Sequence, residues 1–112
     1  MEKNIETSYK ILKILEENPE YTQRKIAKEL GYSLGKVNYI ISALVDKGII
    51  KLHRFLKSKN KAGYRYILTP EGIKEKYRIT REFLKRKLKE YEQIKKEIDE
   101  AKERLNSSNK EG

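Results

Sequence analysis

The sequence is a chain of 112 residues with 27 lysines and arginines, 17 acidic side chains, one histidine and no cysteine. That length suits one small domain, and the lack of cysteine excludes disulfides and thiolate metal sites, while His53 cannot form a zinc site alone. The net charge of +10 favours a polyanionic partner, most often nucleic acid.

The same survey limits the classes of protein to consider. No apolar run approaches the roughly 18 residues of a membrane span, so we expect a soluble cytoplasmic protein that is not exported. No carboxylate pair, no nucleophile beside a base and no phosphate-cradling loop is present, so an enzyme is the least supported class. We expect neither a cofactor nor a metal.

Three short helices are predicted within the first 48 residues. Apolar residues recur at helical spacing over residues 6–18, and the sequence Asn-Pro-Glu then ends this helix. Thr22 can cap a second helix, which Gly31 can end in a left-handed conformation. Ser33 can cap a third helix that runs to Lys47, before Gly48.

A two-stranded hairpin is predicted next, because the period of the apolar residues changes to two after Gly48. Its strands cover about residues 50–56 and 64–68, and the stretch 56–64 is their basic connection, where Gly63 can adopt an unusual backbone angle. Residues 49–70 hold six basic and no acidic side chains, which is most of the net charge. His53 is expected to be a strand surface residue rather than a pH sensor.

A long helix is predicted from Thr69 and Pro70, a cap followed by a first-turn proline, to about Leu105. Its apolar residues repeat every seven positions, which predicts a coiled-coil seam for dimerisation. Residues 106–112 are polar and are expected to form a disordered tail. The seam contains Tyr77, Leu84, Tyr91, Ile94, Ile98, Ala101 and Leu105.

The second and third helices have the spacing of a helix-turn-helix. Ala27, Gly31 and Val37 supply the small residue, the turn residue and the apolar anchor that two helices joined by a tight turn need. With Val37, Ile40, Ile41 and Leu44 facing the core, the third helix turns a polar face outward that can read a major groove or can simply be solvated. That face contains Gly35, Lys36, Asn38, Tyr39 and Ser42.

The segments "TQRKIAKELGYSLGKVNYIISALVDKGIIK", "SKNKAGYRYILTPEGIKEK" and "REFLKRKLKEYE" resemble winged-helix transcriptional regulators of the MarR family. They are most similar to its small branch associated with exopolysaccharide gene clusters. The resemblance covers about residues 7–105 and implies a dimeric regulator of double-stranded DNA, with a recognition helix at 33–47 and a basic wing at 56–64. It carries no effector-binding residue over to this chain, so an effector remains unknown.

The fold expected is therefore mainly helical with a small β-hairpin: a winged helix-turn-helix over residues 1–70, followed by a dimerisation helix over 71–105. A protein-interaction adaptor and a general RNA or single-strand binder are the alternatives, and Tyr64 and Tyr66 either pack the hairpin or stack on bases. The candidate DNA-binding residues are Thr22, Gln23, Arg24, Ser33, Gly35, Lys36, Asn38, Tyr39, Ser42, Arg54, Lys57, Lys59, Asn60, Lys61 and Arg65.

Overall fold

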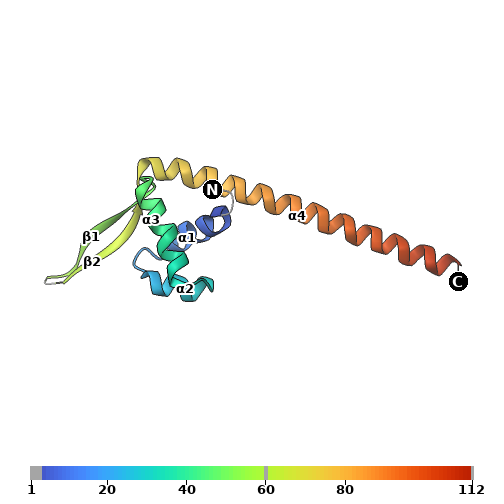
Figure 1. Cartoon of the computed structure of the whole chain (residues 1–112), viewed down its shortest axis with the longest axis horizontal. Coiled ribbons are helices and arrows are strands. Elements are labelled where there is room, and N and C mark those ends of the chain that lie inside the picture. Colours follow the sequence, from blue (N-terminus) through green and yellow to red (C-terminus); the bar gives the residue numbers. More distant parts are fainter. Residues whose placement is uncertain (1–3, 60, 112) are drawn as a thin grey trace.

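The structure, a computed structural model, describes residues 4–59 and 61–111 and confirms the expected fold class (Figure 1). Three helices gather into a small body, a hairpin projects from one side of it, and a single long helix leaves in another direction. The elements are α1 (Ile5–Glu17), α2 (Gln23–Leu30), α3 (Leu34–Asp46), β1 (Ile50–Ser58), β2 (Lys61–Leu68) and α4 (Pro70–Glu111).

The helix boundaries follow the caps that the sequence contains. The Thr22 hydroxyl oxygen accepts a hydrogen bond from the backbone N–H of Lys25 at 3.1 Å, and the Ser33 hydroxyl does the same for Lys36 at 3.1 Å. Gly31 ends α2 with a φ of 71°, a left-handed conformation that costs glycine little. These local signals set the turn between α2 and α3, as predicted.

The core lies where α1, α2 and α3 meet the start of the hairpin. Ile11, Ile26, Val37, Ile41 and Ile49 are each no more than 2% exposed. Each apolar helix stripe loses contact with water only when the other helices cover it, so burial of these side chains is what holds the three helices together.

The hairpin is longer than the sequence predicts. β1 pairs antiparallel with β2 from Ile50 opposite Leu68 to Ser58 opposite Lys61, with an irregularity between Leu56 and Ser58. Most of the stretch expected to be a loop is therefore paired strand. Gly63 does not adopt a positive φ; instead, the side chains of Phe55 and Lys57 pass over it, where a Cβ atom would lie 3.1 Å from the Phe55 ring.

The start of α4 is fixed against the junction of α3 and β1. The Thr69 hydroxyl accepts from the Gly72 N–H at 2.9 Å and donates to the carbonyl of Gly48, which confirms Thr69 as a cap. Gly72 lies so close to the backbone of Ile49 that a Cβ atom would overlap its carbonyl group, 2.8 Å from the carbon. Only glycine permits this approach.

The first turns of α4 pack along α1. Ile79 is buried, and the ring of Phe83 stacks on Tyr9 with 4.5 Å between centroids. The carboxylate of Glu16 pairs with Lys76 in the same region. The first four to five turns of α4 are therefore part of the folded body.

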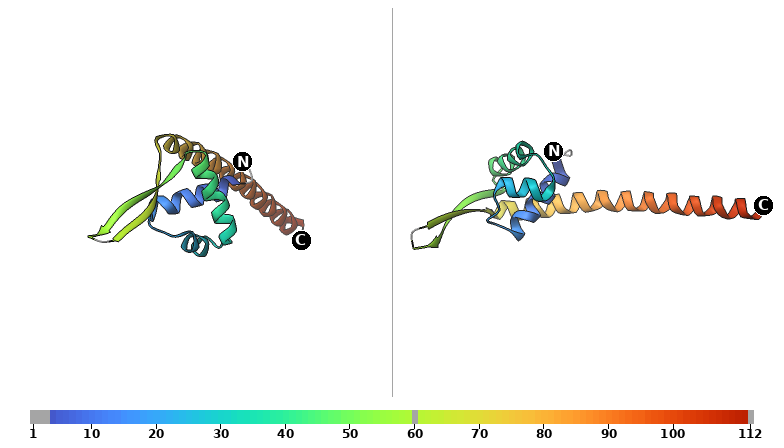
Figure 2. Two further views of the ribbon diagram at one scale, coloured as in Figure 1. Left: turned by 60° about the vertical axis from the view of Figure 1, so that its left-hand side comes forward. Right: turned by 90° about the horizontal axis from the view of Figure 1, so that it is seen from below.

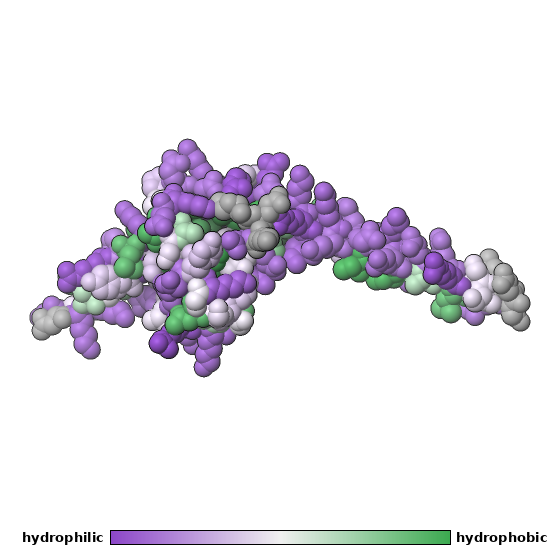
Figure 3. Space-filling model, in the orientation of Figure 1, coloured by the Kyte–Doolittle hydropathy of each residue, from purple (hydrophilic) through white to green (hydrophobic). Residues whose placement is uncertain are grey.

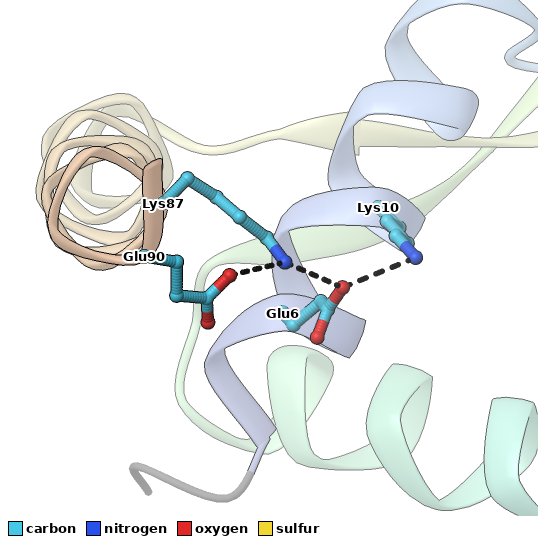
Figure 4. A network of polar contacts seen from close by, with 4 residues as sticks. All are labelled: Glu6, Lys10, Lys87 and Glu90. Carbon is cyan, nitrogen blue, oxygen red and sulfur yellow. Dashed lines mark hydrogen bonds and ion pairs between the residues drawn. The ribbon is translucent and has the colours of Figure 1, made fainter. Parts of the chain in front are cut away.

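A polar network closes this α1–α4 contact (Figure 4). The Glu6 carboxylate lies 3.3 Å from the Lys10 Nζ atom and 3.8 Å from that of Lys87, which in turn lies 3.2 Å from Glu90. The hydrogen bond from Lys10 and the charge of Lys87 lower the pKa of the Glu6 carboxyl, and the same hydrogen bond raises the pKa of Lys10. Lys87 thus turns toward α1.

Beyond this contact α4 projects away from the body, which gives a molecule 78 Å long and 26 Å wide (Figure 2). It continues to Glu111, whereas the sequence predicts a disordered tail from residue 106. No glycine or proline occurs between Gly72 and Gly112 to interrupt the helix. Among the described residues, no helix is long and apolar enough to span a membrane.

Candidate nucleic-acid interface

The outer face of α3 carries the residues predicted to read bases. Gly35, Lys36, Asn38, Tyr39 and Ser42 are all exposed, and the Tyr39 side chain is 64% exposed. The opposite face holds the buried anchors of the core, so this orientation of the helix is determined by packing. The Lys36 Nζ atom lies 4.2 Å above the centre of the Tyr32 ring, a cation–π contact that holds this cation beside the helix N-terminus.

A chain of side-chain hydrogen bonds joins α3, α2 and the hairpin. The Asn38 amide nitrogen donates to the Gln23 carbonyl oxygen at 3.1 Å, and the Gln23 amide nitrogen donates to the Tyr66 hydroxyl oxygen at 3.4 Å. These two bonds hold the Asn38 and Gln23 amides in a chain that joins α3 to the hairpin. The Asn38 carbonyl oxygen and the Tyr66 hydroxyl proton are left available to a ligand on the exposed side.

The three candidate DNA-binding residues at the N-terminus of α2, which are Thr22, Gln23 and Arg24, differ in their side-chain contacts. The hydroxyl oxygen of Thr22 is occupied as the helix cap, and Gln23 is occupied in the amide chain. Arg24 is exposed. Only Arg24 therefore matches the simple expectation of a side chain free to approach a phosphate.

The basic side chains of the hairpin divide between its two faces and its tip. Arg65 and Lys57 share a face with Phe55, and the Arg65 guanidinium lies 5.1 Å above the Phe55 ring. The Lys57 Nζ atom is 3.8 Å from the Glu20 carboxylate, which comes just before α2. Arg54 lies on the opposite face, paired with Tyr64.

The tip itself is the most freely exposed part of this basic region. Lys59 and Lys61 are exposed at the end of the two strands, and Asn60 lies outside the described residues. The hairpin extends well beyond the helices (Figure 2), so these cations are not brought next to the α3 face within the free protein. A ligand that contacts both must be extended.

Several contacts in this region were not predicted from the sequence. Tyr66 and Glu20 enter through hydrogen bonds or ion pairs with residues more than 30 positions away, which no local pattern reveals. His53 is half-buried, more enclosed than expected, and its Nδ1 atom has no hydrogen-bond partner among the described residues. A hollow of about 200 Å³ lies between α1 and β2, lined mainly by apolar side chains such as Leu12, Leu15 and Leu68.

The side chains of the predicted seam on α4 are exposed, both beside the body and along the projecting part of the helix. Leu84, Tyr91, Ile94, Ile98 and Leu105 are each between 51% and 62% exposed, and Figure 3 shows apolar surface along one side of this part of the helix. Tyr77 and Ala101 are also exposed. The described side chains beyond Glu90 are all exposed.

Comparison with known proteins bears on the N-terminal part of the chain. Residues 6–51 match the family described as winged helix-turn-helix DNA-binding. These residues and the hairpin after them form a winged helix-turn-helix domain. Within this domain, α3 is the second helix of the helix-turn-helix motif, and the hairpin is the wing.

Several solved structures are similar to this chain at low sequence identity. The PcaV transcriptional regulator from Streptomyces coelicolor is 22% identical over 70% of this chain and 56% of its own, with a TM-score of 0.52. Staphylococcus aureus MarR in complex with salicylate and kanamycin is 19% identical over 74% of this chain and 53% of its own, with a TM-score of 0.49. Streptococcus pneumoniae FabT in complex with DNA is 24% identical over 79% and 57%, with a TM-score of 0.49.

The chain spans a little over half the length of these three proteins. Among curated proteins, none matches it.

Proposed function

We propose that this protein is a sequence-specific regulator of transcription that binds double-stranded DNA as a homodimer, in the manner of the MarR family and its small exopolysaccharide-associated branch. The observation that carries the proposal is the exposed polar face of α3, whose orientation is fixed by the buried side of the helix, together with the basic hairpin that projects from the same body (Figure 1). The match of residues 6–51 to a DNA-binding winged helix-turn-helix family supports it. Cytoplasmic action and the absence of catalysis belong to the same proposal.

In this proposal α3 enters the major groove. Lys36 donates to guanine acceptors or to phosphate, and Asn38 presents its free carbonyl oxygen to a base amino group. Tyr39 and Ser42 lie on the same face and extend the contact along the groove. Gly35 adds no side chain and leaves open space around it, so the backbone can come close to the DNA.

The wing supplies contacts that do not depend on sequence. Lys59 and Lys61 at its tip, with Arg54 on one face, contact phosphates or enter the adjacent minor groove. The proposed DNA-contacting residues of the wing also include Arg65, Lys57 and Asn60, the last of which lies outside the residues that the structure describes. At the other side, Arg24 and the N-terminus of α2 approach the backbone of the DNA.

The dimer proposed here uses the α4 seam, so that residues 1–70 bind DNA and the helix joins two copies. Two recognition helices then reach half-sites about 34 Å apart, one turn of the duplex. A palindromic site is the expected consequence, because the symmetry of the DNA site follows that of the protein.

Selection of bound duplexes from a random pool tests the proposal. We expect enrichment of a palindrome whose half-sites are one helical turn apart, with dimers present in solution by sedimentation. Variants in which Lys59 and Lys61 become glutamine should bind every duplex more weakly and select the same sequence. A pool that shows no enrichment, or that favours single-stranded nucleic acid over duplex, would contradict it.

A further inference from the structure

The projecting part of α4 has an apolar stripe with nothing upon it among the described residues, and its charges indicate how a second copy fits there. We propose that the α4 helices of two copies pair as a parallel, in-register coiled coil over residues 88–105, with both DNA-binding domains at one end. This inference rests on the proposed homodimer. It adds the orientation, the register and the starting point of the pairing.

The starting point follows from the contacts of α4 with its own body. Ile79 and Phe83 are buried against α1, and Lys87, which occupies a seam position, is turned toward Glu6. A second helix cannot replace these contacts without exposing the core. Close pairing of two α4 helices therefore begins after Lys87, where Leu88 is 57% exposed.

The stripe beyond this point has the spacing of a coiled coil. Tyr91, Ile98 and Leu105 repeat every seven residues, and Ile94 and Ala101 fall between them at the second core position. All five are exposed in the single chain. Pairing two such stripes removes these apolar side chains from water, which is the driving force for association.

The charges beside the stripe select the parallel orientation. In a parallel pair, the residue directly before a core position such as Tyr91 or Ile98 lies near a residue of the other helix. The number of that second residue is five higher than its own. For this chain that rule brings Glu90 near Lys95 of the second copy and Glu97 near Lys102. By symmetry each contact occurs twice, so four pairs of opposite charge flank the core.

An antiparallel pair would bring like charges together. That arrangement places the flanking positions of one kind against each other, with Lys95 and Lys102 on one side of the core and Glu90, Glu97 and Arg104 on the other. If Tyr91 packed on Ile94 of the second copy, Glu90 would lie near Glu97 of that copy. Moving the register by seven residues in one direction sets Lys95 against Lys95 and Glu97 against Glu97. It also brings Glu90 near Arg104 twice, which gives two pairs of opposite charge against the four of the parallel pair. Like charges at this separation oppose association.

The chain contains no cysteine, so single cysteines can report the orientation directly. Tyr91→Cys and Leu105→Cys are made separately and oxidised at equal protein concentration. In a parallel, in-register pair each residue faces its own copy, within the range of a disulfide. In an antiparallel pair, only a residue at the symmetry axis faces its own copy, and these two positions are 14 residues or about 21 Å apart.

We expect both variants to form covalent dimers. Lys96→Cys, on the opposite side of the helix, is the matched control and should remain mainly uncross-linked. Cross-linking of only one of the two stripe variants, or of neither, in a protein that sediments as a dimer would overturn the parallel pairing. Circular dichroism of each variant confirms that the helix is retained.

The test separates this inference from the proposed function. The cross-linking is done without DNA, and binding to duplex is measured on the reduced proteins. Failure to bind duplex with both disulfides formed contradicts the proposed function and leaves the pairing intact. A protein that sediments as a monomer at all concentrations contradicts the homodimer and the pairing together.

Discussion

At the scale of single residues, Gln23 determines how Asn38 meets a ligand. Its carbonyl oxygen accepts from the Asn38 amide nitrogen, while its own amide nitrogen donates to Tyr66. An asparagine without such a partner can present either its oxygen or its nitrogen to a base edge. Here one orientation is favoured before DNA arrives, so Gln23 and Tyr66 are expected to act on base preference through Asn38.

Substitution of these three residues tests that role. Asn38→Ala should reduce discrimination between the selected duplex and its single-base variants by about 1–3 kcal/mol, the value of one good base contact. Gln23→Ala and Tyr66→Phe should lower discrimination in the same direction by a smaller amount. Fluorescence anisotropy at fixed salt measures both affinities.

Tyr64→Phe provides the matched control for Tyr66→Phe. It removes a hydroxyl group from the same face of the hairpin, without a described bond to Gln23. It should leave base discrimination unchanged. If Tyr66→Phe weakens binding to all duplexes equally, its hydroxyl contacts the DNA backbone and does not act through Asn38.

The lysines of the wing are predicted to differ in their contribution to DNA affinity. Lys59 and Lys61 are exposed at the tip without an ion pair to any residue that the structure describes, whereas Lys57 lies beside Glu20 in the unbound protein and must leave it to contact a phosphate. Replacing Lys59 and Lys61 by glutamine should lower the slope of log affinity against log salt by about 1.8, if each meets one phosphate. Lys57→Gln should change the slope less.

The counterpart of this prediction is Glu20→Gln, which removes the competing carboxylate. It should strengthen binding at low salt, because Lys57 is then available and a negative charge near the DNA is lost. Titrations at four or more salt concentrations give all the slopes. Equal slopes for the three lysines would show that the ion pair with Glu20 has no influence on binding.

At the scale of elements, the approach of Gly72 to Ile49 joins the long helix to the DNA-binding body. Gly72→Ala should lower the free energy of unfolding by about 1–3 kcal/mol, because the added methyl group overlaps backbone that cannot move aside easily. Chemical denaturation followed by circular dichroism measures this loss.

Gly35→Ala is the control for stability, since nothing lies within 4 Å of the position that its methyl group would take. That substitution should leave the free energy of unfolding unchanged or raise it by up to about 1 kcal/mol, the helix preference of alanine over glycine. A Gly72→Ala variant as stable as the original chain would mean that the start of α4 shifts at no cost.

The elements show which features a sequence can reveal. Thr22, Ser33 and Thr69 cap helices as predicted, and Gly31 adopts its left-handed turn, because a cap depends on residues three or four positions away. The predicted inward face of α3 was confirmed for a similar reason. The spacing of the apolar residues along one helix matches the set of side chains that are buried. Existence and type of all six elements followed from such local rules.

The features that were missed depend on distant partners. The packing of Phe83 on Tyr9 joins residues 74 positions apart, and it makes the first half of α4 part of the body rather than of the coil. The steric role of Gly63 depends on the opposite strand, and so does the length of the hairpin. The candidate site shows the same difference between local and distant features. The exposed face of α3 could be predicted from the spacing within one helix, whereas the hydrogen bond from Gln23 to Tyr66 could not.

At the scale of the whole molecule, one helix serves two purposes along its length. Its first turns complete the core, and the part beyond Glu90 has no contact with the body. The stability of the domain and the strength of dimerisation should therefore be separable. A change in the projecting part should alter association without altering the melting temperature of the domain.

Ile98→Lys tests this separation, with Gln93→Lys as a control that adds the same charge away from the stripe. A lysine at position 98 would place two charges within the apolar core of the pair, so the dimer should dissociate at least about tenfold more readily. Binding to a two-half-site duplex should weaken, while binding to a single half-site stays unchanged because α3 and the wing are intact. Sedimentation and anisotropy measure these effects. Equal loss of affinity for both duplexes, or a lowered melting temperature, would mean that this part of α4 also supports the DNA-binding domain.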